Sequence, residues 1–585
     1  MRITLAQIEP VTGDLEGNCA RILEVIRTHD SHSDVIVFPE MAVTGYNCGS
    51  DFESEEFIRE ATDLLLNSII PAAINSHIIV GCPLKGYPGN ERNGAIRLHN
   101  SAVVAHHGRV QGIYNKFYLA NDSHHEDRKY FLPGDGQFVT FETGGELCGV
   151  LICEDIWAED HDRDLIAEMK RVHPALSTVF VINYSYFTYE KQPYRLKLLE
   201  RHAREKDTHI VYVNAVGIGD IVKNIISYDG GSWALSRTGQ VIARLPEFRE
   251  AVTTITIPAE DDMTNEPAGC RDFDGKCSRL WGAICFTVRR MYDLMGIERA
   301  QVHVSGGLDS AIVAVAAVEA LGGERTVLIT NPSQYNGEEL LDTGRRLAAA
   351  LNVPMHSVPI SAFSSAVLDD MDADAVRSGA ATLPSQIGMV KSTVDAVGRT
   401  MIGLAECHFN HAAVLATGNH TENVLGWANF HDIGSIGLFQ PIGDLTKTEL
   451  FELAAWINRK YDREIIPAEL YDGTIKPAAE LADAREDPFD YYLVSGICAE
   501  IIRHRKTRKQ LYTDWQMRKL SEDYFPGDDV YAYDETIWRD TVDMCWKRSR
   551  SASVYKSAQA APILMLSPRS RGFSSRETII TRYKG

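Results

Sequence analysis

The stretch HVSGGLDSAIVAV, from His303 to Val315, lies just past the middle of the 585-residue chain and decides the fold of its second half. Val302 and Val304 alternate with their neighbours as residues of a short β-strand do. The apolar residues of AIVAVAAVEAL, which follow the loop, recur with helical spacing. The sequence therefore predicts a strand, a tight loop and a helix in that order.

The loop SGGLDS has the residue types of a phosphate-binding turn. Gly306 and Gly307 can take backbone angles that side chains forbid, and the N–H groups of the loop and of the helix start converge on an anion. No Lys follows the glycines as in the GxxxxGK[ST] loop; Asp309 stands there instead, and a carboxylate is better suited to holding Mg²⁺. The alternative is an ordinary strand-to-helix turn with a Ser or Asp cap.

Length and composition limit the class of protein. A chain of 585 residues suggests three or four domain-sized units, and 44% hydrophobic with 24% charged residues is typical of a soluble globular protein. The start MRITLAQIEP lacks the apolar core of a signal peptide, and no stretch is long enough to span a membrane, so we expect a cytoplasmic protein without a membrane partner. A net charge of −21 argues against a nucleic-acid partner.

Cysteines and basic runs give weaker signals. None of the 11 cysteines lies in a CxxC pair, so neither a disulfide framework nor a zinc site is favoured. The basic runs RHRKTRKQ (503–510) and WKRSRS (546–551) are interpreted mainly as solvated faces.

The chain divides into two parts of α/β pattern. The first alternates β-rich runs such as DVIVFPE, HIIVGCP and GVLICED with helical stretches such as CARILEVIRTH. The polar segment AEDDMTNEPAGCRDFDG (259–275) lacks periodicity and predicts a linker. We therefore predict a first domain over 1–260, a linker over 261–280 and a second domain over 281–585. RTVLITNPS, EELLDTGRRLAAAL and AAVLATGN predict a doubly wound parallel sheet in the second domain.

Three chemically complementary residues close predicted strands of the first domain, where α/β folds place their chemistry. Glu40 ends VIVFPE, Lys116 lies in IYNKFYL and Cys153 lies in GVLICEDIW. A thiol attacks an amide if a carboxylate takes its proton and a cation stabilises the oxyanion, so this set is complete for hydrolysing a C–N bond. Taken singly, such a Cys is usually core, and such a Glu or Lys is usually surface.

These segments resemble a known family. FPEMAVTGY, NKFYL and LICEDIW, together with AQIEPVTGDLEGN, resemble the motifs of the nitrilase (carbon–nitrogen hydrolase) family over roughly the 260 N-terminal residues. The resemblance implies an αββα sandwich with Glu40 as general base, Lys116 as oxyanion stabiliser and Cys153 as nucleophile. It also implies a glutamine-binding group formed by Ser185 and Lys191 of INYSYFTYEK and by Glu126 or Asp127 of HHEDRKYFLPG, two residues that the sequence does not separate.

The second domain resembles the ATP-pyrophosphatase superfamily through SGGLDS, and the run from Ala416 to Leu450 resembles the NAD synthetase signature, with TGN, an acidic residue, GD and LTK in order. The resemblance implies ATP-binding, deamido-NAD⁺-binding and Mg²⁺-binding residues. For ATP they are Ser305, Gly306, Gly307, Asp309, Ser310, Thr417 and Lys447; for deamido-NAD⁺ they are Arg399, Glu422, Asp432 and Lys476; for Mg²⁺ they are Asp309 and Glu422.

Together the two resemblances imply an enzyme that takes ammonia from glutamine and uses ATP with Mg²⁺ to amidate deamido-NAD⁺ through an acyl-adenylate. Direct transfer between two joined domains protects ammonia from loss by protonation and diffusion. The resemblance also implies a homo-oligomer, a dimer or an octamer, for which HAAVLAT (411–417) and GWANF (426–430) offer apolar surface.

Three segments depart from the family patterns. STVDAVGRTMIG (392–403) keeps Arg399 but has no Gln-Ala-Arg, DPFDYY (487–492) stands where a pattern like DSLPPY is usual, and LAND (119–122) puts Asp122 in place of an aromatic residue. Two alternatives therefore remain: an amidotransferase of the same architecture acting on another carboxylate, and a nucleotide-binding regulator on a degenerate scaffold. The second would show a lost nucleophile or a broken loop, and the sequence shows neither.

Overall fold

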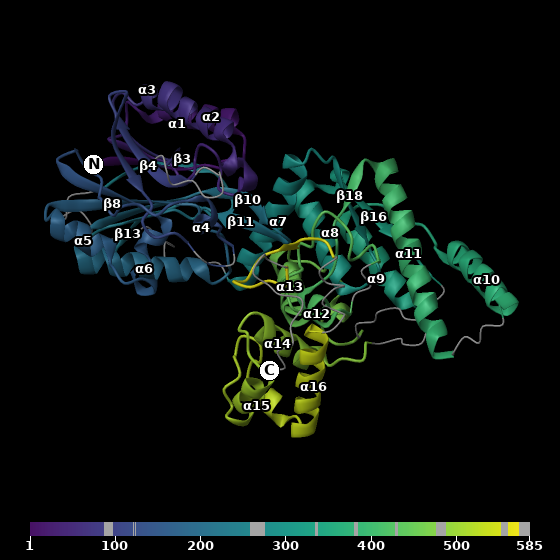
Figure 1. The fold of residues 1–585 in the computed structure, drawn as a ribbon. Coiled ribbons are helices and arrows are strands. Elements are labelled where there is room, and N and C mark those ends of the chain that lie inside the picture. Colours follow the sequence, from purple (N-terminus) through teal and green to yellow (C-terminus); the bar gives the residue numbers. More distant parts are fainter. Residues whose placement is uncertain are drawn as a thin grey trace. The chain divides into compact units, whose positions relative to one another are not determined.

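The computed structural model describes residues 1–86, 97–120, 122, 124–257, 275–333, 337–378, 384–427, 431–475, 487–550 and 560–572. Contacts divide the chain into two compact units (Figure 1). The first is Met1–Ile221 with Ile226–Gly275, and the second is Val222–Ile225 with Lys276–Gly585.

Two six-stranded sheets form the centre of the first unit. One has the order β14-β1-β2-β3-β4-β5 and the other the order β13-β12-β9-β8-β7-β6. The strands of the first sheet are β1 (Arg2–Gln7), β2 (Val35–Val37), β3 (His77–Lys85), β4 (Leu98–His106), β5 (Arg109–Asn115) and β14 (Ala251–Thr256). Those of the second are β6 (Thr140–Thr143), β7 (Glu146–Ile152), β8 (Leu176–Asn183), β9 (His209–Asn214), β12 (Trp233–Leu235) and β13 (Val241–Arg244).

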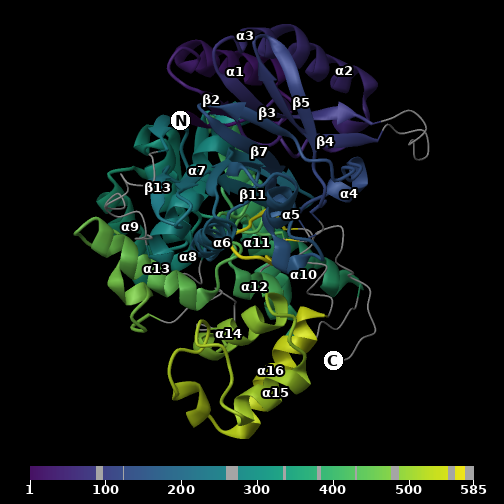
Figure 2. The ribbon, with the colours of Figure 1, turned by 90° about the vertical axis from the view of Figure 1, so that its left-hand side faces the viewer.

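Helices cover the outer faces of both sheets. Figures 1 and 2 show α1 (Leu15–His29), α2 (Glu55–Leu64) and α3 (Ile70–Ala72) over the first sheet, and Figure 1 shows α5 (Leu165–Val172) and α6 (Lys191–Lys206) over the second. Because successive side chains of a strand point to opposite faces, Val35 and Val37 pack in the core between the sheets, whereas Ile36 packs with the helices. The predicted αββα sandwich is confirmed.

A four-stranded parallel sheet forms the centre of the second unit. Its order is β17-β16-β15-β18, with β15 (Arg299–His303), β16 (Thr326–Thr330), β17 (Met355–Ser357) and β18 (Ala412–Val414). The chain runs outward from β15 to β17 and then returns to pair β18 with the other edge of β15, which is the topology of a doubly wound sheet. The predicted fold class of this half is confirmed.

Helices connect and flank these strands. They are α7 (Lys276–Leu294), α8 (Leu308–Leu321), α9 (Glu338–Leu351), α10 (Ser361–Ser378), α11 (Pro384–Asn410) and α13 (Lys447–Lys460). The stretch HAAVLAT, expected to offer interface surface, instead contains β18, and Val414 and Leu415 are buried. The reason is that a short apolar run in a parallel sheet is covered on both faces.

A helical cluster follows the sheet. It contains α12 (His420–Leu425), α14 (Tyr491–Ile502), α15 (Arg508–Gln516) and α16 (Glu535–Ser549), which share a core that includes Val424, Ile497 and Trp538. Arg503, the first residue of the basic run RHRKTRKQ, is buried, so the expected solvated face does not include it. Its charge is matched by the buried Glu449 carboxylate, 3.0 Å away.

The last described strand of the second unit is β19 (Ile563–Leu564), which pairs in parallel with Asn224 and Ile225 of the same unit. Among the described helices, none combines the length and the apolar character needed to cross a membrane.

Candidate active sites

Cys153 comes directly after β7, in a strained turn of the first unit. Its φ of +45° lies in the left-handed region that non-glycine residues rarely adopt, and its side chain is buried. In a turn of this kind at the end of a buried strand, one side chain points away from the direction in which the strand runs. The predicted nucleophile therefore has a backbone conformation of the kind found at functional sites.

A buried ion cluster contains two of the other predicted residues. Lys116 Nζ lies 2.9 Å from Glu40 Oε1 and 2.8 Å from Asp127 Oδ2. Asn100 Nδ2 donates to Glu40 Oε1 at 2.6 Å, and the backbone N–H of Tyr184 donates to Glu40 Oε2 at 2.7 Å. Both oxygens of the Glu40 carboxylate are therefore held by hydrogen bonds.

The electrostatics of this cluster keep the Cys153 thiol protonated and the Lys116 side chain charged. Burial and the Glu40 charge raise the pKa of Cys153 well above its ordinary value, so the resting side chain is a neutral thiol. Burial alone would lower the pKa of Lys116, but Asp127 and Glu40 raise it well above the ordinary value and keep the ammonium charged. Glu40 can then accept the thiol proton while Lys116 faces a developing oxyanion.

The structure separates Glu126 from Asp127. Asp127 is buried, accepts a hydrogen bond from Ala120 N at 3.0 Å and is bonded to the Tyr46 hydroxyl as well as to Lys116. Glu126 is partly exposed instead, and its Oε1 lies 3.7 Å from Nζ of the exposed Lys129. The sequence did not resolve them because the two residues are adjacent at the start of the four-residue helix α4 (Asp127–Tyr130).

Asp155, which the sequence did not single out, ties the nucleophile turn to the strand end that carries Lys116. Its Oδ2 accepts from the Tyr114 hydroxyl at 2.8 Å and from Ile152 N at 3.2 Å, while its Oδ1 accepts from the amides of Phe117 and Tyr118 at 3.1 and 2.8 Å. Burial raises its pKa to about 7. The LICEDIW motif contains this residue but gives no signal for its four partners.

The predicted glutamine-binding residues lie around Tyr186. Lys191 Nζ lies 3.7 Å from the centre of the Tyr186 ring, and burial lowers the pKa of Lys191 to about 8. Ser185 accepts a hydrogen bond from Arg195 at 3.1 Å through its hydroxyl oxygen. Asp122, where the family has an aromatic residue, is bonded to the Tyr186 hydroxyl at 3.0 Å and to His125 Nδ1 at 2.9 Å.

The loop SGGLDS has the predicted form, with one glycine in a special conformation. Gly306 has φ +94°, and a Cβ there would lie 1.9 Å from the carbonyl oxygen of Leu340. Gly307 has an ordinary extended backbone, φ −82°, so only one of the two glycines uses angles that side chains forbid. Ser310 Oγ donates to Gly307 O at 3.0 Å, and Ser305 Oγ accepts from Gly307 N at 3.2 Å. These contacts hold the loop open at the start of α8.

Three predicted residues meet beside this loop. Asp309 is bonded to Lys447 Nζ and accepts from Asn419 Nδ2 at 3.1 Å. Lys447 Nζ also lies 3.9 Å from Glu422 Oε1. Burial and the nearby Asp309 charge raise the pKa of Glu422 to about 8, so the two carboxylates compete for one lysine. A divalent cation bound here would favour the ionised form of Glu422 beside Asp309.

The remaining predicted residues form a second polar group. Arg399 Nη2 lies 2.5 Å from Asp432 Oδ2, and Asp432 Oδ1 accepts from Gly434 N at 3.3 Å. Thr417 N donates to Gly434 O at 2.9 Å, which brings Thr417 to the same turn. Lys476 lies outside the described residues.

The departing segment DPFDYY also contacts the site. Its Asp487 accepts from the Tyr491 hydroxyl at 2.6 Å and from Trp427 Nε1 at 3.1 Å. Lys447 Nζ lies 5.6 Å from the centre of the Tyr491 ring. The segment therefore provides an aromatic wall beside Lys447 although its sequence differs from the family pattern.

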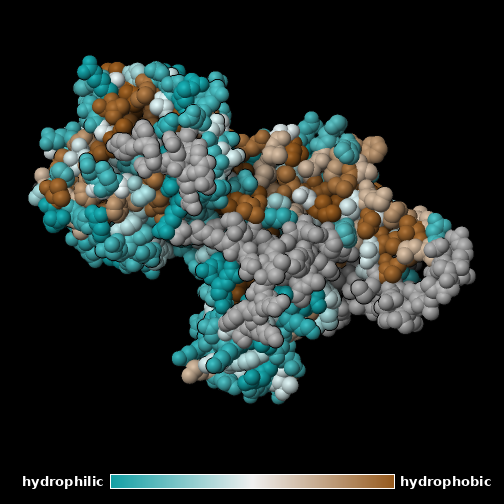
Figure 3. Space-filling view, in the orientation of Figure 1, coloured by the Kyte–Doolittle hydropathy of each residue, from teal (hydrophilic) through white to brown (hydrophobic). Residues whose placement is uncertain are grey.

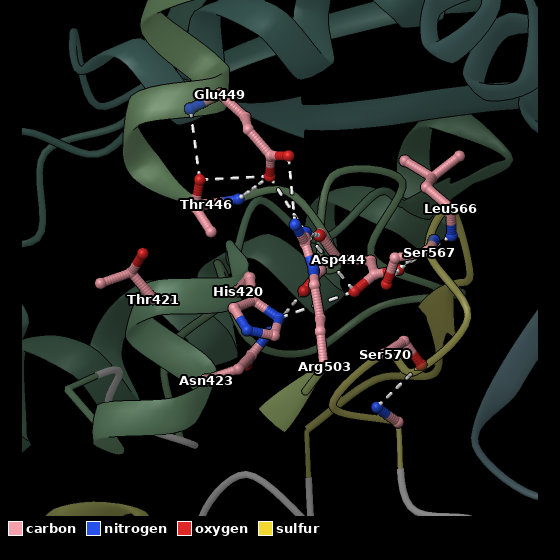
Figure 4. A network of polar contacts seen from close by, with 12 residues as sticks. His420, Thr421, Asn423, Asp444, Thr446, Glu449, Arg503, Leu566, Ser567 and Ser570 are labelled. Carbon is pink, nitrogen blue, oxygen red and sulfur yellow. Dashed lines mark hydrogen bonds and ion pairs between the residues drawn. The ribbon is translucent and has the colours of Figure 1, made fainter. Parts of the chain in front are cut away.

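A buried polar network, drawn in Figure 4, supports the loop that leads to Lys447. Glu449, in the first turn of α13, accepts from Arg503 Nη2 at 3.0 Å and from Lys276 Nζ at 2.8 Å. Thr446 caps α13 by accepting from Glu449 N at 3.3 Å. The charge of Arg503 and Lys276 lowers the pKa of Glu449 despite burial, so this carboxylate stays ionised.

Comparison with known proteins relates each half of the chain to a known family. Residues 2–261 match the carbon–nitrogen hydrolase family and residues 280–517 match the NAD synthase family. A glutamine-dependent NAD⁺ synthetase from Thermotoga maritima is 26% identical, with 100% of this chain and 99% of the relative covered. Solved structures of glutamine-dependent NAD⁺ synthetases share the fold. The one from Cytophaga hutchinsonii has a TM-score of 0.79 at 16% identity, with 100% of this chain and 98% of that chain covered. The one from Acinetobacter baumannii, in complex with ADP, has a TM-score of 0.69 at 21% identity, with 99% and 98% covered.

The chain is thus a two-domain enzyme that joins a carbon–nitrogen hydrolase domain to an ATP-using ligase domain. Residues 2–261 form its carbon–nitrogen hydrolase domain and residues 280–517 its NAD synthase domain.

Proposed function

We propose that this chain is a glutamine-dependent NAD⁺ synthetase, which amidates deamido-NAD⁺ with ammonia released from glutamine and with energy from ATP. The observation that carries the proposal is that one chain holds both a Glu40–Lys116 pair near a buried Cys153 and an Asp309–Lys447–Glu422 group beside a phosphate-type loop. Full-length similarity to glutamine-dependent NAD⁺ synthetases supports it.

In the first unit, Glu40 takes the proton of Cys153 as the sulfur attacks the amide carbon of glutamine. Lys116, held by Glu40 and Asp127, stabilises the oxyanion of the tetrahedral intermediate. Glu40 then returns the proton to the leaving nitrogen, which departs as ammonia. Water hydrolyses the glutamyl thioester and frees Cys153 and glutamate. We assign Ser185 and Lys191 to the α-amino-acid end of glutamine, because a buried ammonium beside Tyr186 suits a carboxylate.

In the second unit, the carboxylate of deamido-NAD⁺ attacks the α-phosphorus of ATP and pyrophosphate leaves. Ammonia attacks the resulting acyl-adenylate, and NAD⁺ and AMP form. The loop amides from Ser305 to Ser310 and the Lys447 ammonium hold phosphate oxygens. We assign Arg399 and Asp432 to deamido-NAD⁺, since their paired charges and hydrogen-bonding groups are suited to a polar dinucleotide.

The residues present fit a magnesium ion. Asp309 and Glu422 offer two carboxylates that share one lysine, and Glu422 has a pKa raised to about 8 by burial and Asp309, which a bound cation would relieve. Mg²⁺ is commonly held by one or two carboxylates together with substrate phosphates. When bound, the ion would neutralise phosphate charge.

We further propose a homo-oligomer, at least a dimer, that acts in the cytoplasm, where ATP is available. The support is α11, on which the large apolar residues Met401, Leu404 and Phe409 are exposed, Phe409 by 82%. Figure 3 shows apolar side chains gathered over this part of the second unit. Sedimentation velocity tests the assembly, and an active monomer would contradict it.

One experiment tests the proposed function directly. The full chain is incubated with deamido-NAD⁺, ATP, Mg²⁺ and glutamine labelled with ¹⁵N at its amide, and products are identified by mass spectrometry. We expect NAD⁺ that carries the label, with AMP and pyrophosphate in equal amounts. Formation of ADP, or a lack of NAD⁺ while another carboxylate is amidated, would contradict the proposal.

A further inference from the structure

The C-terminal segment 560–572 lies outside the range that matches the NAD synthase family, 280–517. It is nevertheless largely buried, and its strand β19 is part of the second unit. No residue of this segment belongs to the sites described above, although it contacts the loop between α12 and α13 that carries the GDLTK motif.

The segment meets that loop at one buried carboxylate. Oδ2 of Asp444 accepts three hydrogen bonds from it, from Leu566 N at 2.9 Å, from Ser567 N at 2.7 Å and from Ser567 Oγ at 2.7 Å (Figure 4). Asp444 and Leu566 are almost entirely buried, and so is Ser567. Burying a carboxylate lowers stability unless hydrogen bonds replace those that it made with water. These three donors therefore stabilise the Asp444 carboxylate and fix its position.

Asp444 stands three residues before Lys447, and the intervening backbone is tied to α12. The carbonyl of Leu445 accepts from His420 N at 2.9 Å, and Lys447 N donates to Thr421 Oγ1 at 3.2 Å. The same short helix carries Glu422, which lies near the Lys447 ammonium. A shift of Asp444 would therefore move the start of α13 and with it the lysine that pairs with Asp309.

Further hydrogen bonds fix the segment beside this loop. Gln440 N donates to Pro562 O at 2.7 Å, Leu564 N donates to Gln440 O at 3.1 Å, and Gln440 Nε2 donates to Ala561 O at 2.8 Å. Ala561 N donates to Ser435 O at 3.0 Å. The segment is thus laid along residues 435–444 in a fixed register, which delivers Ser567 to Asp444.

We propose that Ser567 is a positioning residue of the synthetase site, which holds Asp444 and through it places Lys447 against the phosphates of ATP. The assignment of Lys447 to ATP rests on the proposed function. The competing explanation is that the segment only covers apolar surface. The two explanations differ in what they require of the Ser567 hydroxyl. Covering apolar surface requires only the volume of the side chain, whereas positioning Asp444 requires its hydrogen bond.

The chain contains a matched control for this residue. Ser570 is a second buried serine of the same segment, and its hydroxyl donates to Asn224 Oδ1 at 2.5 Å and makes no contact with Asp444 (Figure 4). Asp444 also keeps its neighbour Arg503, whose Nη2 lies 3.9 Å from Oδ1, and both backbone donors when the Ser567 hydroxyl is removed. Loss of that hydroxyl alone therefore leaves enough contacts for the fold.

The test compares full-length S567A, S567T and S570A with the unchanged protein. The measured quantities are kcat/KM for ATP with ammonium as nitrogen source, glutamine hydrolysis, and Tm. We expect S567A to lose about tenfold in kcat/KM for ATP, the usual effect of removing a hydrogen bond to a charged group. S567T, which keeps the hydroxyl, and S570A should stay within about twofold of the unchanged protein, and glutamine hydrolysis should be unaffected in all three.

Two results would overturn the proposal: unchanged kinetics in S567A, or equal losses in S567A and S570A. If S567A does not fold, S567C replaces it, since a thiol fills the space but is a weak donor; the same loss is expected, and normal kinetics would again overturn it. Calorimetric affinity for Mg-ATP keeps this test separate from the proposed function. An unchanged protein that makes no NAD⁺ would contradict the function, whereas weaker Mg-ATP binding by S567A alone would still support the role of Ser567.

Discussion

We expect the use of glutamine to depend on Cys153. Replacing it by Ala removes the thiol whose pKa responds to Glu40 and Lys116, whereas the Sγ of Cys148, on β7, lies 3.9 Å from Met1 Sδ. We expect C153A to form no NAD⁺ from glutamine and to keep at least half of its synthesis from ammonium at mildly alkaline pH, as roughly expected for two separate cores. NAD⁺ formation is followed with each nitrogen source.

Two outcomes would contradict this division of labour. Continued use of glutamine by C153A would show that another residue is the nucleophile. Failure of ammonium to restore synthesis in a folded C153A protein would show that the second unit needs the thiol.

Asp155 should be needed for the rate of glutamine hydrolysis. The N–H₂ group of an Asn in its place would face Ile152 N, which is also a donor, so this hydrogen bond would be lost. It is one of the four that Asp155 accepts where the Cys153 turn meets Tyr114 and the residues around Lys116. We expect D155N to lower kcat for glutamine at least roughly tenfold with a smaller change in KM. Synthesis from ammonium in the same preparation reports whether the protein is folded.

Asp162 provides the control for D155N. It also accepts a hydrogen bond from a tyrosine, Tyr118, but it does so at the surface and makes no contact with the Cys153 turn. D162N should hydrolyse glutamine at the normal rate, and equal losses in both variants would show that Asp155 has no special role.

Asp309 should be needed with either nitrogen source. D309N keeps the size of the side chain but removes the charge that faces Lys447 and the proposed Mg²⁺. We expect cleavage of ATP to AMP and pyrophosphate to fall more than about a hundredfold at saturating Mg²⁺, while glutamine hydrolysis shows that the protein is folded. Near-normal cleavage would show that Asp309 only caps α8.

At this scale the sequence indicated the candidate residues of the two sites better than the residues that hold them. Glu40, Lys116 and Asp309 lie in local motifs, so their types and spacing were sufficient to propose them. Asp155 and Ser567 act through partners that folding brings together, Tyr114 and Asp444, the latter 123 positions from Ser567. No local pattern contains that information.

At the scale of elements, Gly306 is the position in the loop between β15 and α8 that should not tolerate a side chain. An added Cβ would be strained at φ +94° and would lie 1.9 Å from Leu340 O, so the loop must move away from α9. We expect G306A to lower the free energy of unfolding of the second unit by about 2 kcal/mol or more and to abolish ATP cleavage. Thermal unfolding and pyrophosphate release measure the two effects.

Gly307 supplies the comparison for G306A. Its backbone is extended, and the nearest atom to an added Cβ is Ser305 Oγ at 3.3 Å. G307A should therefore change the free energy of unfolding by less than about 1 kcal/mol. Equal destabilisation by both variants would show that the conformation of Gly306 is not the cause.

Elements were predictable where apolar periodicity and turn residues agree. The strand, loop and helix around SGGLDS follow from them, and so do the alternating β-rich runs of the first unit. HAAVLAT was assigned to surface because its composition suits an exposed apolar helix and a buried parallel strand equally well, and only its pairing with β15 decides. Likewise, the basic run RHRKTRKQ gave no sign that Arg503 would be buried against Glu449.

At the scale of the whole molecule, the two units differ in chemistry but share a response to acid. Burial lowers the pKa of His77 and His209 in the first unit, and of His303 in the second, to about 4. In the unfolded chain these groups titrate near 6.5. Their contribution to stability is therefore complete above pH 6.5 and is lost as the pH falls toward 4, because the unfolded state then binds protons that the folded state does not.

This predicts that Tm falls between pH 6.5 and 4 in both units. His77 offers a test of the cause, since its ring stacks on His106 at 4.0 Å and on Phe141 at 4.7 Å, and Phe in its place keeps the stack without a titrating group. We expect H77F to unfold with a flatter dependence of Tm on pH over that range, measured by scanning calorimetry in buffers of equal ionic strength. H32F, at an exposed histidine of the same unit, should keep the steep dependence of the unchanged protein. An H77F profile parallel to that of the unchanged protein would show that protonation of His77 does not limit acid stability, and the loss would then have to arise from the other buried histidines or from the carboxylates paired in both sites.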